Sequence, residues 1–134
     1  MPIEFDLVTI DVANDVAMAA FWSAALNLEE IESEDGSRWR VFGLRHCDGS
    51  TTRRLGLQRI PNLGAAIQSW EGPSKSRQHL DLKCSLAEFN AEVDRVVALG
   101  ATELRPRRTE YYGSIATLAD PEGNLFDICA YADW

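Results

Sequence analysis

The chain has 134 residues, a length that favours one domain over two. Its 13 basic and 21 acidic side chains give a formal net charge of −8 at pH 7. This charge argues against nucleic acid as a partner, because binding phosphate requires a concentrated basic face. No apolar run reaches the roughly 20 residues of a membrane helix, and the first residues carry acid where a signal peptide needs positive charge. The sequence therefore predicts a cytoplasmic protein without a membrane partner.

The three cysteines, Cys47, Cys84 and Cys129, are an odd number and show no CxxC spacing. Two of them, Cys84 and Cys129, lie inside segments in which apolar residues alternate with polar ones. Such positions are typical of reduced core thiols, so we expect no disulfide and assign the cysteines no chemical role.

The first half of the sequence begins with a predicted strand and helix. Residues 4–12 alternate between apolar and polar side chains in their second half, which is typical of a strand. Asn14 or Asp15 follows as the N-cap of a helix, and Leu26–Asn27 ends it, because Asn tolerates the left-handed cap conformation. Apolar residues recur along this helix in two rows, Val16, Ala20 and Ala24 in one, Ala17 and Phe21 in the other.

Two Asp-Gly pairs, Asp35–Gly36 and Asp48–Gly49, divide the segment after this helix. An Asp-Gly pair between apolar runs favours a two-residue hairpin turn. Three antiparallel strands are therefore expected between the helix and Ile60.

The second half repeats this order of elements. Residues 79–84 alternate as a strand, with Leu80, Leu82 and Cys84 on one face and His79, Asp81 and Lys83 on the other. Ser85 and Glu88 have the spacing of a capping box at a helix start, and Gly100 supplies the C-terminal cap. The inner stripe of this helix is Phe89, Val93, Val96 and Val97. Further strands are expected over 101–105, 114–120 and 125–131, with a tight turn at 120–124.

The two halves are related as an internal repeat. His79 stands 72 residues after Leu7, and Leu99–Gly100 stands 73 residues after Leu26–Asn27, so strand phase and helix end recur together. The sequence thus predicts an α+β fold of two βαβββ modules in a single domain. Module one covers 1–60, a linker covers 61–76, and module two covers 77–134.

Several segments together resemble the vicinal oxygen chelate superfamily, and more narrowly its glyoxalase-like and bleomycin-resistance-like members. They span almost the whole chain and read FDLVTIDVAND, AAFWSAALNLE, LGLQRIP, RQHLDLKCSLAEFNAEVDRVVALGATEL and LADPEGNLFDI. The resemblance implies that the two modules curl into a cupped, mostly antiparallel sheet (glyoxalase/bleomycin resistance/dioxygenase-like). It also implies a concave face that often holds a divalent metal, with ligands from the first and last strands of each module.

The resemblance carries metal ligands over at two positions. Asp127 stands four residues after the Gly of DPEGN, where members present a carboxylate, and His79 stands where they present a histidine. At the two other positions Leu7 replaces the usual His, and Gln58 replaces the usual Glu or His. A catalytic metal generally needs three good protein ligands. With His79, Asp127 and only Gln58 as a third, the site is expected to hold zinc, nickel, iron or manganese weakly.

The same residues allow other interpretations. Asp11 and Asp81 share the alternation face and can add oxygen ligands, although solvent-facing carboxylates are the preferred interpretation. His79 and Asp127 can act together as catalytic acid and base. Alternatively, His79 only forms a hydrogen bond with Asp127 across adjacent strands.

The residues expected to line the substrate site are Gln58, Leu7, Trp39, Trp70 and Tyr112. Arginines gather in two stretches that can receive an anionic substrate, Arg53, Arg54 and Arg59 in the first and Arg105, Arg107 and Arg108 in the second. A solvated charged face is the preferred interpretation of such stretches.

The leading hypothesis for the function is a glyoxalase-like enzyme, a lyase or a related activity, that acts on a small organic molecule. Any metal would act as a Lewis acid. The alternative is a metal-free binding protein of the bleomycin-resistance type, favoured by the missing ligand at Leu7, and a structural or regulatory domain is a third hypothesis. Because the superfamily commonly buries sheet edges by pairing chains, a homodimer is expected.

Overall fold

The computed structural model describes residues 2–33, 38–64, 71 and 76–132. The chain divides into two compact units, Met1–Gly64 and Ala65–Trp134, and the division lies inside the expected linker. The predicted turn at Asp35–Gly36 and the predicted site residue Trp70 lie outside the described residues. In the part of the chain that is described, no helix has the length and apolar character needed to cross a membrane.

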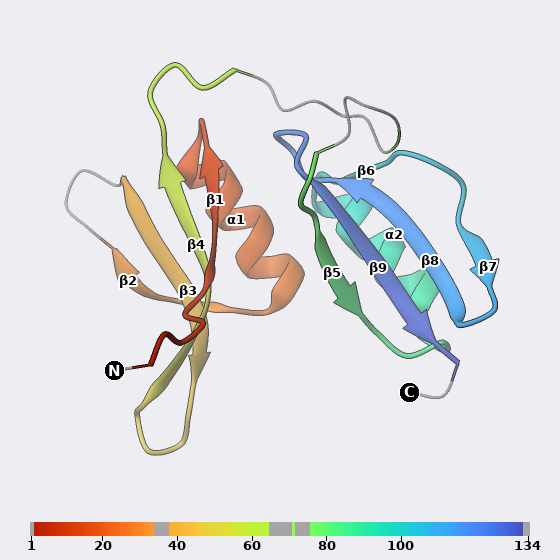
Figure 1. The fold of residues 1–134 in the computed structure, drawn as a ribbon, viewed down its shortest axis with the longest axis horizontal. Helices are drawn as coiled ribbons and strands as arrows, with labels where there is room; N and C mark the ends of the chain where they lie inside the picture. Colours follow the sequence, from red (N-terminus) through yellow and green to blue (C-terminus); the bar gives the residue numbers. More distant parts are fainter. Residues whose placement is uncertain (1, 34–37, 65–70, 72–75, 133–134) are drawn as a thin grey trace. The chain divides into compact units, whose positions relative to one another are not determined.

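The first unit is a four-stranded sheet with one helix packed against it (Figure 1). Its elements are β1 (Val8–Val12), α1 (Asp15–Leu26), β2 (Glu29–Ser33), β3 (Trp39–Arg45) and β4 (Thr51–Arg59). The strand order is β1-β4-β3-β2, and β1 runs parallel to β4 while the other pairs are antiparallel. This is the βαβββ order that the sequence predicts.

Both predicted ends of α1 are confirmed, and of the residues in its two apolar rows only Phe21 is buried. The Asn14 side chain accepts a hydrogen bond from the Ala17 N–H at 3.0 Å, and Asn27 ends the helix with φ 52°. The Val16 side chain is 65% exposed, so the row that begins there faces away from the sheet. The buried residues are Asp15, Met18, Phe21, Trp22 and Ala25. Because nearly every position in this helix is apolar, the larger side chains select the buried face.

The second unit repeats the plan, with its helix on one side of a five-stranded sheet (Figure 1). Its elements are β5 (Leu80–Lys83), α2 (Phe89–Leu99), β6 (Thr102–Glu103), β7 (Arg108–Glu110), β8 (Gly113–Ala119) and β9 (Leu125–Tyr131). The order is β5-β9-β8-β6, and β7 also pairs with β8. Among the described strand pairs of this unit, β5–β9 is parallel and the others are antiparallel. The α+β class and the two βαβββ modules are therefore confirmed, with one sheet in each module.

Two local features of the second unit differ from the prediction. The expected strand over 101–105 is short, and the edge of the sheet continues in β7 beyond a break that contains Pro106, which has no N–H to donate. The Ser85 hydroxyl does accept a hydrogen bond from the Glu88 N–H at 3.3 Å, but the α-helix begins only at Phe89. A turn therefore precedes α2, and the capping serine lies outside the helix.

Alternation along the strands gives the second sheet two different faces. Phe126 and Ile128 of β9 are buried on the side that α2 covers, whereas Asp127 between them points to the other side. We call this other side the helix-free face; it carries Asp81, Lys83, Asp127, Cys129, Thr117, Ile115 and Arg108.

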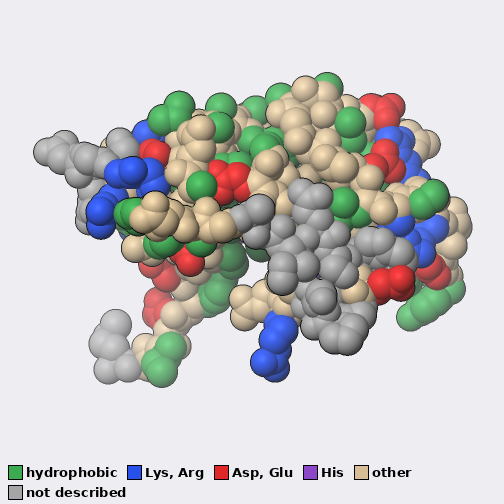
Figure 2. All heavy atoms as spheres, turned by 90° about the horizontal axis from the view of Figure 1, so that it is seen from above, with side chains coloured by type: hydrophobic (Ala, Val, Ile, Leu, Met, Phe, Trp, Pro, Cys, Tyr) green, Lys and Arg blue, Asp and Glu red, His purple; other side chains and the backbone are tan. Residues whose placement is uncertain are grey.

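The surface mixes charge of both signs. On the face drawn in Figure 2, Lys and Arg side chains lie in separate small groups among acidic and apolar side chains.

Candidate functional site

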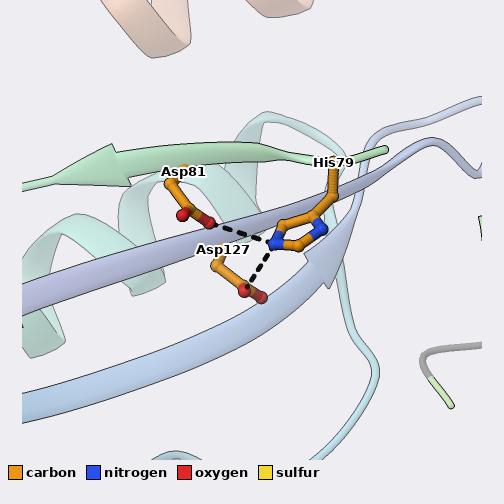
Figure 3. A group of neighbouring side chains, drawn as sticks. All are labelled: His79, Asp81 and Asp127. Atoms are coloured by element: carbon orange, nitrogen blue, oxygen red, sulfur yellow. Dashed lines mark ion pairs between the residues drawn. The ribbon is translucent and has the colours of Figure 1, made fainter. Parts of the chain in front are cut away.

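Three polar side chains meet on the helix-free face of the second unit (Figure 3). His79 directly precedes β5, Asp81 lies on β5, and Asp127 lies on β9. The Nε2 atom of His79 is 3.2 Å from Oδ1 of Asp81 and 3.4 Å from Oδ2 of Asp127. Figure 3 shows the imidazole directed toward both carboxylates. The predicted catalytic pair, His79 and Asp127, is thus in contact, and Asp81 joins it.

Local sequence and strand pairing together build this arrangement. The alternation in β5 directs Leu80 and Leu82 toward the helix side and leaves His79 and Asp81 on the other face. The parallel pairing of β5 with β9 then places Asp81 beside Asp127 in register. Two carboxylates on adjacent strands repel each other unless a proton or a cation lies between them.

Exposure differs among the three side chains. The side chain of Asp127 is 16% exposed, that of His79 is 34% exposed, and that of Asp81 is 59% exposed. Asp127 is therefore the most desolvated member of the group, and its charge acts most strongly on its surroundings. Asp81 lies at the outer edge, in contact with solvent.

Burial, and to a lesser extent the negative charge of this group, raises the pKa of two neighbouring side chains, the Cys129 thiol and the Tyr112 phenol. Burial raises the pKa of the Cys129 thiol above its usual value, and the negative charges of Asp81 and Asp127 raise it further. Burial likewise raises the pKa of Tyr112, with Glu110 as the next cause. Both groups stay protonated at neutral pH, so neither supplies a thiolate or phenolate nucleophile here.

The donor atoms fit a divalent cation. One ligand atom from each of His79, Asp81 and Asp127 lies within 4.8 Å of the other two. Ligands about 2.1 Å from a common ion lie about 3 to 4 Å apart. The three side chains thus need only small adjustments to hold one ion, and carboxylate oxygens with one imidazole nitrogen are suitable donors for it.

The remaining predicted site residues divide between the units. Trp39 and Gln58 face each other in register on β3 and β4 of the first unit, and Leu7 directly precedes β1. The ring of Trp39 lies over Gly56, where a Cβ atom would be 2.8 Å from the indole. In the second unit, Tyr112 directly precedes β8 and packs against Tyr131, with the ring centroids 6.2 Å apart.

Sequence reasoning missed Thr117 and did not single out Arg108. Thr117 lies opposite Asp127 on the neighbouring strand β8, and Nη1 of Arg108 donates a hydrogen bond to its Oγ1 at 3.3 Å. The alternation of β8 contained the signal for Thr117. The position of Arg108 on this face could not be predicted, because it depends on the pairing of β7 with β8, which the sequence pattern does not show.

The family comparison agrees with this fold. The family model for the glyoxalase-like domain matches residues 7–129. No curated protein resembles the chain closely enough in sequence to count as a match.

Three solved structures illustrate the likeness in fold. The fosfomycin resistance protein FosX of Listeria monocytogenes, complexed with Mn(II) and sulfate ion, is 20% identical, with 98% of this chain and 93% of that chain covered and a TM-score of 0.69. A glyoxalase/bleomycin resistance/dioxygenase family enzyme of Burkholderia phytofirmans is 22% identical, with 94% and 97% covered and a TM-score of 0.67. A glyoxalase-related enzyme of Fulvimarina pelagi is 20% identical, with 98% and 90% covered and a TM-score of 0.69. The chain belongs to the glyoxalase-like domain family, within the vicinal oxygen chelate superfamily.

Proposed function

We propose that the protein is a glyoxalase-like enzyme that acts on a small organic molecule at the helix-free face of its second unit, with a divalent cation held by His79, Asp81 and Asp127. The observation that carries the proposal is the convergence of three ligand atoms within 4.8 Å of one another. Three protein ligands leave positions on a cation for water and substrate. Asp81 thereby supplies the third good ligand that the sequence pattern lacks at Leu7 and Gln58.

The donor set favours particular ions. Carboxylates suit manganese and magnesium, whereas imidazole suits zinc, iron and nickel. When bound, the cation supplies Lewis-acid chemistry at a substrate oxygen. One structural neighbour, FosX of Listeria monocytogenes, is complexed with Mn(II). Mn²⁺ is therefore the first ion to test, and the exposure of Asp81 favours weak retention.

A proton and a cation compete for the same position in this site. Without a cation, a proton on Nε2 of His79 bridges to the carboxylate of Asp81 or Asp127. Binding a cation requires the lone pair of that nitrogen, so the proton must leave or move to Nδ1. In the cation-free state His79 can donate its Nε2 proton to a bound molecule, and Asp127 can accept one.

The alternative function is a metal-free small-molecule binding protein. The specific observation in its favour is that Nε2 of His79 lies 3.2 Å from a carboxylate oxygen of Asp81 and 3.4 Å from one of Asp127, so that a single proton on Nε2 lies between the two carboxylates. Such a site is complete with a proton between its members and needs no ion. Leu7 and Gln58, at the other ligand positions of the family, also favour this alternative, because neither side chain is a good metal ligand.

Manganese binding tests the proposal directly. The protein is stripped with EDTA, dialysed and titrated with MnCl₂, and free Mn²⁺ is measured by its electron paramagnetic resonance signal. We expect one ion per chain in the wild type. Asp127→Asn and Asp81→Asn should each weaken binding about tenfold or more, because each removes a charged ligand. Glu88→Gln is the matched control, since it removes an exposed carboxylate of the same unit outside the site.

Two outcomes would contradict the metal-dependent form of the proposal. One is a wild-type protein that leaves all Mn²⁺ free at millimolar concentration, which would favour the metal-free binding protein. The other is an Asp127→Asn variant that binds Mn²⁺ as tightly as Glu88→Gln, which would place the ion elsewhere.

We also propose lyase chemistry, a cytoplasmic location, a homodimeric assembly and the joining of both units in a single domain. We retain zinc, nickel and iron beside manganese as candidate ions, and Trp39, Trp70, Tyr112, Leu7 and Gln58 as candidate substrate contacts.

A further inference from the structure

Three of the six arginines that can receive an anionic substrate form ion pairs with carboxylates of their own unit. Arg53 pairs with Asp6 and Glu32, Arg59 approaches Asp15, and Arg107 pairs with Glu103 and Asp94. Arg108 differs from these three in its position. It lies on β7 and shares the helix-free face of the second unit with Asp127.

A polar row connects Arg108 to the His79 group. In register, Asp81 on β5 lies beside Asp127 on β9, which lies beside Thr117 on β8. Nη1 of Arg108 donates to Oγ1 of Thr117 at 3.3 Å, which completes the row. The row therefore begins with two carboxylates and ends with a guanidinium. At the backbone, Arg108 lies two strand spacings across and two residues along from Asp127, about 12 Å away.

The guanidinium retains capacity for a ligand. Its Nε is 3.5 Å from Oε1 of Glu110, longer than a good hydrogen bond, and the Glu110 side chain is 43% exposed and free to turn away. Within the described part of the chain, Nη2 of Arg108 has no hydrogen-bond partner. The Arg108 side chain is 22% exposed, so its charge is less screened than that of a surface arginine.

Thr117 adds a second donor at the same place. The residue is 7% exposed, and its hydroxyl oxygen already accepts a hydrogen bond from Arg108. A hydroxyl that accepts one bond still has its own proton to donate. A guanidinium edge and a buried hydroxyl side by side are suited to two oxygens of one carboxylate or phosphate.

Cys129 lies between these groups on the same face. It follows Asp127 by two residues on β9 and is in register with Ile115 of β8, which in turn pairs with Arg108 of β7. A small molecule on this face would experience the opposite charges of Asp127 and Arg108.

We propose that Arg108 and Thr117 form an anion subsite that binds the carboxylate or phosphate group of the small molecule whose other end reaches His79 and Asp127. The inference rests on the proposed function in one respect, that this face receives a small molecule. It identifies the substrate class as a small acid. The net charge of −8 repels anions on average, and a localised positive group offsets this repulsion at one place.

The test uses the full chain without metal, so that it does not depend on cation binding. The ¹⁵N-labelled, EDTA-treated protein is titrated separately with inorganic phosphate and with succinate, and amide and Arg108 Nε–H resonances are followed. We expect saturable shifts at Arg108, Thr117 and neighbouring residues. The tighter of the two probes shows whether the subsite prefers a phosphate or a carboxylate group.

Three variants make the test specific. Arg108→Gln should weaken binding of the tighter probe about tenfold or more, corresponding to about 1.4 kcal/mol. Thr117→Val keeps the side-chain shape and should weaken it by a smaller factor. Arg54→Gln removes an exposed arginine of β4 in the first unit and should leave binding unchanged. Dispersed amide spectra establish that each variant is folded.

Each outcome bears on the inference separately from the proposed function. Absence of saturable shifts with both probes, or equal affinity in Arg108→Gln and Arg54→Gln, would overturn the anion subsite. Mn²⁺ binding is measured independently and should be retained in Arg108→Gln. A protein that binds succinate or phosphate at Arg108 but no Mn²⁺ would retain the subsite and lose the metal-dependent function. A protein that binds Mn²⁺ but neither succinate nor phosphate at Arg108 would retain the metal site and lose the subsite.

Discussion

Asp81 and Asp127 occupy the same register position on the neighbouring parallel strands β5 and β9. Side-by-side carboxylates are unfavourable in isolation, and here Nε2 of His79 contacts both of them. A site that collects two negative charges around one imidazole attracts either a proton or a divalent cation.

Replacement of His79 by alanine should lower the free energy of unfolding by only about 1 kcal/mol or less, because the imidazole is 34% exposed and water can reach the carboxylates it leaves. Urea unfolding of the EDTA-treated protein measures this, with ligand binding measured in parallel. A loss of about 3 kcal/mol or more would show that the group is a buried structural pair. Retained binding of both Mn²⁺ and small acids would remove His79 from the functional site.

Asp120 should be far more important for stability than a similar aspartate in an exposed hairpin. The carboxylate of Asp120 is 1% exposed and accepts hydrogen bonds from the N–H groups of Glu122 and Asn124. Asp120→Ala leaves these donors unsatisfied and should cost about 2 to 4 kcal/mol. Asp48 accepts in the same way from Ser50 on the surface, so Asp48→Ala is the matched control and should cost much less. Equal losses in the free energy of unfolding for Asp120→Ala and Asp48→Ala, measured in urea, would contradict this prediction.

Replacing Arg40 should destabilise the protein more than replacing Arg59, because the two arginines approach the buried Asp15 at different distances. Nε of Arg40 is 2.8 Å from Asp15 and that of Arg59 is 3.9 Å away. The hydrogen bond to Asp15 is the main reason that the pKa of Arg40 is raised. Arg40→Met should cost about 2 to 4 kcal/mol, since it leaves a buried carboxylate with one distant partner, and Arg59→Met less than about 1 kcal/mol. Chemical denaturation at pH 7 measures both, and the opposite order would show that Arg59 is the real partner.

The cysteines should react with alkylating reagents in the order of their exposure. Cys47 is exposed, whereas burial raises the pKa of Cys84 and Cys129. A raised pKa means less thiolate at a given pH, and thiolate is the reactive form. Iodoacetamide at pH 8 should therefore modify Cys47 at least about tenfold faster, and the rate at Cys84 should rise about tenfold per pH unit below its pKa. Peptide mass spectrometry follows each site, and fast labelling of Cys129 in the folded protein would contradict the prediction.

The homodimer is tested by sedimentation. The strand orders leave β2 at an edge of the first sheet and β5 at an edge of the second, within the described residues. Exposed strand edges are commonly covered by pairing with another chain. We expect a species of twice 14.9 kDa at micromolar concentration. A single species of 14.9 kDa across the concentration range would show a monomer.

Elements with a strong local pattern were predicted well from the sequence. The alternation of β5 and β9 and the Asn caps of α1 were all anticipated at or near their observed positions. The buried face of α1 was not, because an almost uniformly apolar helix contains no period that distinguishes one face from another. The short strand β7 was not predicted either, since its three residues owe their conformation to pairing with β8.

The sequence by itself determined which side of its strand each candidate residue occupies. Side chains alternate along a strand whatever its neighbours are, so His79 and Asp127 were assigned to the face opposite Leu80 and Phe126. Only the tertiary structure decided which of these residues are neighbours. Asp81 and Asp127 are 46 residues apart in the chain, and Asp127 lies beside Asp81 and His79 because β5 and β9 pair in one particular register. Register depends on packing between distant segments, and a local pattern of alternation is the same in every register that preserves the buried face.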